Sequence, residues 1–192
     1  MPLSTTTEIG TIQRTDALAP GTWALDPAHT TIEFVARHMV VAKSRGRFGG
    51  FSGIIQVNED PTRSAAEATI EAASIDTRHE QRDGHLRSPD FLDAVNHPLL
   101  KFRSISFEHV GGPRWRVLGE LTIRDITRPI ELDVEFGGLS KSPWGADVAF
   151  FSATGEINRE DYGMTWNQSL ETGGVLVSKT IEIEIHGEAL RQ

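Results

Sequence analysis

Apolar and polar side chains alternate with a period of two along most of this chain from Thr22 onward, which is the pattern of half-buried β-strands. In the run from His29 to Val41, every second residue from Ile32 is apolar or histidine. Similar rows recur at hairpin spacing, separated by short turns. The row members are Ile32, Phe34, Ala36, His38 and Val40; Ala66, Ala68, Ile70 and Ala72; Trp115, Val117, Gly119, Leu121 and Ile123; Ile130, Leu132, Val134 and Phe136; and Val175, Val177, Ile181, Ile183 and Ile185.

Together these rows predict about eight or nine antiparallel strands, which is typical of a sandwich or a barrel. Glycines inside the strand pattern, at Gly46, Gly49, Gly50 and Gly53, mark bulges or sharp corners. A change of parity predicts a further bulge near Arg103. Long strands with internal glycines favour a curled, closed sheet, so we expect an all-β antiparallel barrel of about eight strands.

The alternation stops between Thr77 and Pro98, and this segment is therefore expected to cap the sheet. A short helix is predicted to start at Glu80 and to be limited by Gly84 and Pro89. The segment combines many charged side chains and histidines with a few apolar ones, as the rim of a ligand-binding barrel does. The alternative is a surface loop that is fastened by ion pairs, such as one between Arg82 and Asp83.

The inward rows mix small residues with bulky apolar ones, and this favours a cavity inside the barrel. Alternatively, aromatic side chains from neighbouring strands fill the interior. An apolar cavity would hold an apolar ligand (the guest), so the side chains expected to line the cavity form the predicted binding set. Its members are Phe34, Ala36, Phe48, Phe51, Ile70, Phe91, Leu92, Phe102 and Leu121 along the tube, Arg82 and His85 nearest a polar headgroup, and His38 as either a hydrogen-bonding residue for the guest or a satisfied core histidine.

Composition removes several classes of function. The chain has 192 residues, 27 acidic against 19 basic, and its net charge of −8 makes nucleic acid an unfavourable partner. No cysteine is present, which excludes thiolate catalysis and cysteine metal sites. The seven histidines lack a metal-ligand spacing, and no nucleophile elbow or phosphate loop appears. Two weaker hypotheses stay open: an enzyme that uses His38 or His85 as acid or base, and a metal or haem binder.

The N-terminal residues contain no basic region followed by an apolar one, and no run of 18 apolar residues occurs. We therefore expect no transmembrane segment and a cytoplasmic protein. Residues 1–21 are rich in threonine and end in Ala-Pro-Gly, which predicts a flexible tail before a single domain at 22–192.

Five motifs in register resemble the YceI-like family over roughly residues 22 to 190. They are Asp26-Pro27-Ala28-His29-Thr30-Thr31-Ile32-Glu33-Phe34, the run from Gly46 to Gly53, Arg82-Asp83-Gly84-His85-Leu86-Arg87-Ser88-Pro89-Asp90-Phe91-Leu92-Asp93 with His97-Pro98, Gly119-Glu120-Leu121-Thr122-Ile123-Arg124-Asp125-Ile126-Thr127, and Ile157-Asn158-Arg159-Glu160-Asp161-Tyr162-Gly163-Met164. The resemblance implies an extended lipocalin-like barrel whose cavity holds a polyisoprenoid chain, such as a prenyl quinone or prenyl pyrophosphate. It implies non-catalytic lipid binding with no required cofactor, and pairing into a homodimer.

Overall fold

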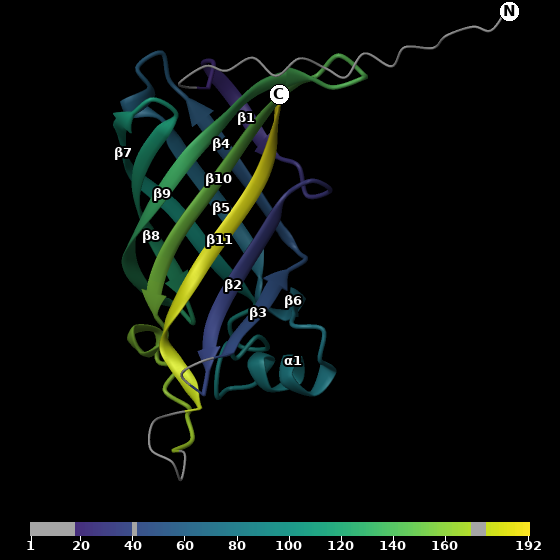
Figure 1. The fold of residues 1–192 in the computed structure, drawn as a ribbon, viewed down its shortest axis with the longest axis vertical. Helices are drawn as coiled ribbons and strands as arrows, with labels where there is room; N and C mark the ends of the chain where they lie inside the picture. The colour runs from purple at the N-terminus through teal and green to yellow at the C-terminus, as the bar shows by residue number, and fades with distance from the viewer. Residues whose placement is uncertain (1–17, 40–41, 170–175) are drawn as a thin grey trace, which may run out of the picture.

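A computed structural model describes residues 18–39, 42–169 and 176–192. Within these ranges the chain forms eleven strand segments and one α-helix (Figure 1). The strands are β1 (Gly21–Leu25), β2 (Thr31–His38), β3 (Ala42–Phe48), β4 (Phe51–Val57), β5 (Ala65–Glu71), β6 (Ile75–Asp76), β7 (Leu99–Gly111), β8 (Arg114–Ile123), β9 (Ile126–Lys141), β10 (Asp147–Asn158) and β11 (Val177–Arg191), and the helix is α1 (Glu80–Arg87). The prediction of an all-β fold is confirmed.

Eight of these strands close into an antiparallel barrel. Their order is β1-β4-β5-β7-β8-β9-β10-β11, and β11 pairs back onto β1 through Trp23, Ala24 and Leu25. Closure removes the free sheet edges that would otherwise invite association with other chains. The bulge predicted near Arg103 is present, because the register of β7 against β8 shifts between Ser104 and Ser106.

The three remaining strands extend the wall beyond the ring. β2 continues the direction of β1 and pairs with β11 from Val177 to His186, while β3 pairs with β2, and β6 with β3. The bend between β1 and β2 is fixed by Thr30, whose Oγ1 donates to the Glu188 carbonyl at 3.1 Å and accepts from the Glu188 N–H at 3.2 Å. β1 and β2 therefore run in the same direction on either side of this bend, and β1 pairs with β4 whereas β2 pairs with β3.

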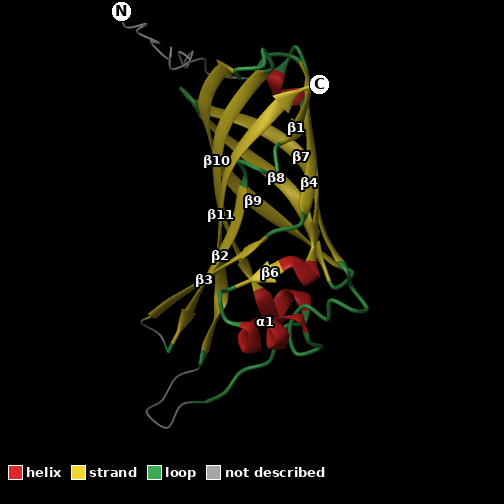
Figure 2. Cartoon of the chain, turned by 90° about the vertical axis from the view of Figure 1, so that its right-hand side faces the viewer, coloured by secondary structure: helices red, strands yellow, loops and turns green. Residues whose placement is uncertain are grey.

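The segment between β6 and β7 caps this extended end of the barrel (Figure 2). The helix predicted from Glu80 is confirmed, and it continues through Gly84 to Arg87. His79 caps its N-terminus, since the His79 Nδ1 accepts from the Arg82 N–H at 3.3 Å. We call residues 77–98 the cap, and the opposite end of the barrel, where β1 begins and β11 finishes, the far end.

Two apolar clusters form the core. The larger one combines inward rows of the strands with Leu92 and Ala94 of the cap. The smaller one lies at the far end around Trp23, which is 0% exposed and donates its Nε1–H to the Ala19 carbonyl at 2.9 Å. Leu18 and Ala19, at the end of the predicted tail, therefore pack against the barrel. Residues 1–17 lie outside the described ranges.

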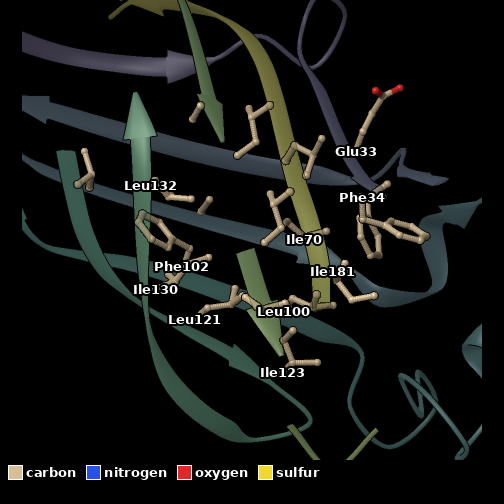
Figure 3. A pocket seen from close by; sticks show the side chains of 18 of the residues that line it. Glu33, Phe34, Ile70, Leu100, Phe102, Leu121, Ile123, Ile130, Leu132 and Ile181 are labelled. Atoms are coloured by element: carbon tan, nitrogen blue, oxygen red, sulfur yellow. The ribbon is translucent and has the colours of Figure 1, made fainter. Parts of the chain in front are cut away.

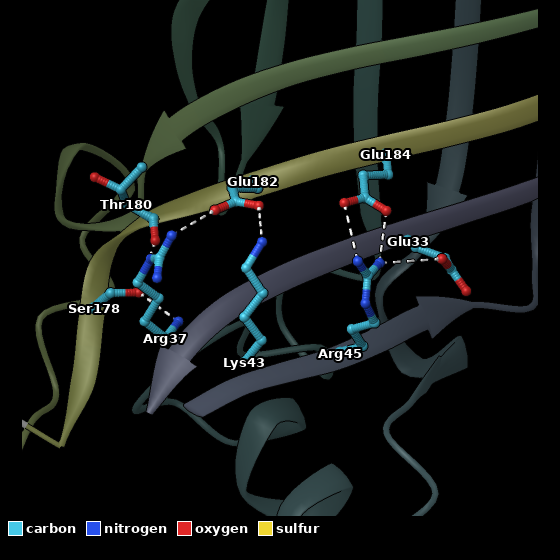
Figure 4. A network of polar contacts seen from close by, with 8 residues as sticks. All are labelled: Glu33, Arg37, Lys43, Arg45, Ser178, Thr180, Glu182 and Glu184. Atoms are coloured by element: carbon cyan, nitrogen blue, oxygen red, sulfur yellow. Dashed lines mark hydrogen bonds and ion pairs between the residues drawn. The ribbon is translucent and has the colours of Figure 1, made fainter. Parts of the chain in front are cut away.

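The outer face of β11, β2 and β3 carries a ladder of ion pairs (Figure 4). Arg45 forms a bidentate contact with Glu184 at 2.6 and 3.3 Å, and Lys43 contacts Glu182 at 3.2 Å. Exposed pairs of this kind contribute about 0–1 kcal/mol each. Val35 lies between its cross-strand partners Arg45 and Glu182 and is only 1% exposed, as expected where long charged side chains flank an apolar one.

Candidate ligand-binding site

A cavity of about 280 Å³ lies inside the barrel, enclosed by inward side chains of the strands and by Leu86, Phe91 and Leu92 of the cap (Figure 3). Its wall is almost entirely aliphatic and aromatic. The charged residues on the described wall are Glu33, Glu67 and Arg159. Glu33 points its carboxylate away from the apolar side chains and approaches Arg45 at 3.7 Å. The interior is therefore hollow, and the alternative of a barrel filled by its own aromatics is wrong.

Two of the aromatic rings leave the hollow open because they lie over glycines of the neighbouring strand. A Cβ atom on Gly46 would come within 2.3 Å of the Phe34 ring, and one on Gly119 within 2.3 Å of the Phe102 ring. Any larger residue at either glycine would push the ring toward the interior. Gly46, expected from the strand pattern to mark a bend, and Gly119, a small member of a predicted inward row, thus provide room for rings against the wall.

A second cavity of about 80 Å³ adjoins the first toward the far end. The two share Ile55, Phe107, Val117, Val134 and Phe151 as lining residues. Trp115 and Phe136 line the second cavity only. Apolar space inside the barrel is therefore found toward the far end as well as beneath the cap.

Most of the predicted binding set lies on the wall of the main cavity. These residues are Phe34, Ala36, Phe48, Ile70, Phe91, Leu92, Phe102 and Leu121. Phe51 is absent from the wall but packs against the same core. Whether any of these side chains contacts a ligand stays a prediction.

The three predicted polar residues do not lie on the wall. His38 is exposed at the end of β2, so its interpretation as a satisfied core histidine is wrong: the strand leaves the barrel before reaching it. Arg82 donates to the Thr77 Oγ1 at 2.7 Å and the Thr77 carbonyl at 2.9 Å, and it forms no ion pair with Asp83. His85 contacts Asp90 at 2.9 Å, at the outer side of the cap.

Arg159 is the basic residue that the structure does place on the wall. It follows β10, and its guanidinium lies 5.9 Å from the centre of the Phe91 ring. Phe91 in turn contacts the rings of His85 and Trp166. Arg159 belongs to the charged run Arg159-Glu160-Asp161, which on sequence alone is typical of ion pairs, and no neighbouring residue marks Arg159 as different from the two acids. The ion pair in this run belongs instead to Glu160, which contacts Lys179 at 2.9 Å.

Tyr162 is a second buried polar residue close to Arg159. It is 1% exposed, its hydroxyl has no hydrogen-bond partner among the described residues, and burial raises its pKa to about 12. In the unfolded chain the same phenol ionises near pH 10, so the folded state is expected to lose stability as the pH rises from about 10 to 12. The loss is about 1.4 kcal/mol per pH unit over that window.

Tyr162 is the only tyrosine of the chain, so phenolate absorbance during an alkaline titration reports this residue alone. The folded protein should titrate near pH 12 and the urea-unfolded protein near pH 10. Tyr162→Phe should remove the alkaline slope of stability while leaving the neutral-pH stability unchanged or slightly higher, because no hydrogen bond is lost. A midpoint near pH 10 in the folded protein would contradict this burial.

Among the described residues, one group has the geometry of a metal site: Asp26, His29 and Glu188 offer ligand atoms within 4.8 Å of one another. His29 contacts Asp26 at 2.7 Å, and this hydrogen bond raises the pKa of His29 and lowers that of Asp26. The group lies at the bend between β1 and β2, and none of its members lines either cavity. A cation held there would not contact a guest in the hollow.

A closed eight-stranded antiparallel barrel with an apolar interior defines the class of lipocalin-like proteins. The sequence-family model of the YceI-like domain matches residues 23–189, so the chain belongs to this family. UPF0312 protein SA2479 of Staphylococcus aureus is 40% identical over 169 residues, which cover 86% of this chain and 95% of that protein.

Solved structures with the same fold include Burkholderia cenocepacia BcnA, with a TM-score of 0.73 and 22% identity over 85% of this chain and 98% of that one. The YCEI protein of Campylobacter jejuni has a TM-score of 0.70 and 28% identity, covering 81% and 90% of the two chains. A polyisoprenoid binding domain from Saccharophagus degradans has a TM-score of 0.62 and 14% identity, covering 88% and 98%.

Proposed function

We propose that this protein binds and carries a long-chain isoprenoid lipid, with the tail inside the barrel and the polar end beneath the cap. The observation that carries the proposal is the pair of adjoining apolar cavities inside the barrel. Membership of the YceI-like family and the fold shared with a polyisoprenoid binding domain support it. The lipid is the ligand, and the proposal requires no other cofactor.

The dimensions and energetics favour a long apolar chain. β11 has 15 residues, which correspond to about 50 Å of extended strand. Each buried CH₂ group contributes about 0.8 kcal/mol, so about ten to fifteen of them give 8–12 kcal/mol before ordering costs. Subtracting about 4 kcal/mol for lost freedom leaves about 4–8 kcal/mol, which corresponds to millimolar to micromolar binding, and a longer buried chain binds more tightly.

The cavity favours binding over catalysis. Neither His38 nor His85 lies on the wall, and the wall within the described residues carries no histidine. A general acid or base must come within hydrogen-bond reach of the reacting group, and haem needs an axial ligand such as imidazole. These observations disfavour an enzyme that uses His38 or His85 and a haem binder, and we propose a non-catalytic carrier or store.

Native lipid analysis tests the proposal directly. Protein purified without detergent is expected to release an isoprenoid lipid on solvent extraction, detected by mass spectrometry. Delipidated protein is expected to take up a prenyl quinone at micromolar concentration. A protein that yields no lipid and takes up none would contradict the carrier function.

Three further predictions concern cellular location, oligomeric state and nucleic-acid binding. No helix in the described ranges is long and apolar enough to cross a bilayer. A cytoplasmic location and a homodimer remain proposals, which fractionation of the producing cells and light scattering of the purified protein would check. Nucleic acid is not expected to bind, given the net charge of −8.

A further inference from the structure

Asp26, His29 and Glu188 converge at the bend between β1 and β2, outside both cavities. Their ligand atoms lie within 4.8 Å of one another, and the His29 Nδ1 is 2.7 Å from the Asp26 Oδ2 and 3.8 Å from the Glu188 Oε2. A tetrahedral zinc ion with bonds of about 2.0–2.1 Å holds its ligand atoms about 3.3–3.4 Å apart. The two distances from Nδ1 lie on either side of this value, so small side-chain rotations would bring the three atoms around one ion.

The backbone holds these residues together independently of their side chains. The Asp26 N–H donates to the Glu188 carbonyl at 2.8 Å, and the His29 N–H donates to the Asp26 carbonyl at 3.2 Å. Thr30, which follows His29, makes two further hydrogen bonds to the backbone of Glu188. Groups that are fixed in advance lose less freedom when they bind a ligand, which favours affinity. The site therefore combines two segments of the chain that are far apart in sequence.

The charges of the two carboxylates are not balanced by lysine or arginine among the described residues. On the same strand as Glu188, Glu184 pairs with Arg45 at 2.6 Å. Asp26 and Glu188 instead share His29, although their side chains are only 16% and 27% exposed. Two carboxylates this close repel each other, and a neutral histidine leaves both negative charges in place. A divalent cation would neutralise both.

We propose that Asp26, His29 and Glu188 bind one divalent transition-metal ion, for which Zn²⁺ is the best match. Imidazole is a good ligand for zinc, copper and nickel, whereas calcium and magnesium prefer oxygen ligands alone. The His29 side chain is 61% exposed, so an ion can enter from solvent and keep water as its fourth ligand. The ion would replace the proton between the His29 Nδ1 and the Asp26 carboxylate, and the neutral imidazole would carry its proton on Nε2.

Such an ion would fasten the bend after β1 to β11, the strand on which β1 closes the ring. An ion that binds the folded state stabilises it by mass action. With zinc at about 100 times its dissociation constant, the melting temperature should rise by about 5–10 °C. None of the three residues lines a cavity, so zinc should leave lipid affinity unchanged, and this inference stands or falls independently of the proposed lipid binding.

Calorimetric titration of zinc into protein without an affinity tag tests the site. One ion per chain is expected, with a dissociation constant in the micromolar range. Glu188→Gln keeps the shape of the side chain but removes its charge, and it should weaken zinc binding by about 10-fold or more. His29→Ala removes the nitrogen ligand and should weaken zinc binding by about 100-fold.

His186→Ala and Glu184→Gln are the matched controls. Both residues lie on β11 near Glu188, but neither belongs to the group of converging ligand atoms. Their replacement should leave the zinc affinity unchanged. Calcium at the same concentration should raise the melting temperature of the unmodified protein less than zinc does, because imidazole is a poor ligand for calcium.

Unchanged zinc affinity in His29→Ala or Glu188→Gln would overturn the proposal, since the zinc would then be held by other histidines. If His29→Ala does not fold, Glu188→Gln and X-ray absorption of the zinc-loaded unmodified protein decide. The absorption spectrum should show one imidazole nitrogen among oxygen ligands, and any other number of imidazoles would overturn the site. Absence of saturable zinc binding, or an equal temperature shift with calcium, would overturn it as well.

Discussion

Replacing Ala68 with tryptophan is expected to weaken lipid binding strongly while the barrel stays folded. Ala68 lies on the cavity wall, with Gly53 and Phe102 as its cross-strand partners. The added indole would occupy space that the lipid tail needs. Losing the burial of about four or more CH₂ groups removes about 3 kcal/mol, which corresponds to at least about 100-fold weaker binding. Titration with a prenyl quinone measures the change.

Leu118→Trp provides the control for this substitution. Leu118 is 37% exposed on the outer face of β8, so the same indole enters solvent rather than the cavity. Its lipid affinity should match that of the unmodified protein. Ala68→Trp should melt at an unchanged or higher temperature, because filling a cavity favours the folded state. A folded Ala68→Trp variant with normal affinity would show that the lipid binds elsewhere.

Much of the barrel follows from local sequence pattern. Alternation predicts which side of each strand faces inward, and Leu121, Ile123, Ile130 and Leu132 of the predicted inward rows all lie on the cavity wall. The change of parity in β7 locates a bulge, because one extra residue must exchange the two faces. Both features are set by residues that are close in sequence, so the sequence pattern alone can predict them.

The closure of the barrel could not be predicted in the same way. β11 pairs with β1 at its end and with β2 before that, although partners such as Thr31 and His186 stand near opposite ends of the chain. Which residues of a strand lie inside the ring depends on this pairing. His38 has the parity of the inward row, yet it lies where β2 has passed beyond the cavity.

For the ligand-binding site, Arg159 is the residue whose burial could not be predicted from local sequence. A run of Arg, Glu and Asp after a strand is typical of a solvated turn, and the two acids behave accordingly. The burial of Arg159 arises from Ser178 at the start of β11 and Phe91 in the cap, which are distant in sequence. Local charge patterning carries no information on such contacts.

The cap depends on a buried carboxylate. Asp83 is 6% exposed and accepts from both the N–H and the Oγ1 of Thr77, at 2.8 and 2.5 Å. Thr77 is itself buried, so no solvent replaces these bonds when the carboxylate is removed. The charge pattern predicts an ion pair between Asp83 and Arg82, whereas both side chains hydrogen-bond to Thr77.

Asp83→Ala is therefore expected to destabilise the cap more than any surface substitution near it. Leaving the Thr77 N–H and O–H donors without their acceptor costs about 2–4 kcal/mol, which lowers the melting temperature by about 5–15 °C. Asp90→Ala removes the exposed contact with His85 and should cost less than about 1 kcal/mol. Calorimetry of the two variants compares these values, and equal melting temperatures would contradict the role of Asp83.

The same substitution should accelerate lipid release, because the cap supplies Leu86, Phe91 and Leu92 to the cavity wall. Local opening exposes these side chains without unfolding the barrel. Hydrogen exchange in Asp83→Ala should therefore rise far more in residues 77–98 than in β8, and the lipid dissociation rate should rise with it. Uniformly faster exchange in both regions would indicate that Asp83 stabilises the whole domain, and the cap would then have no independent control over release.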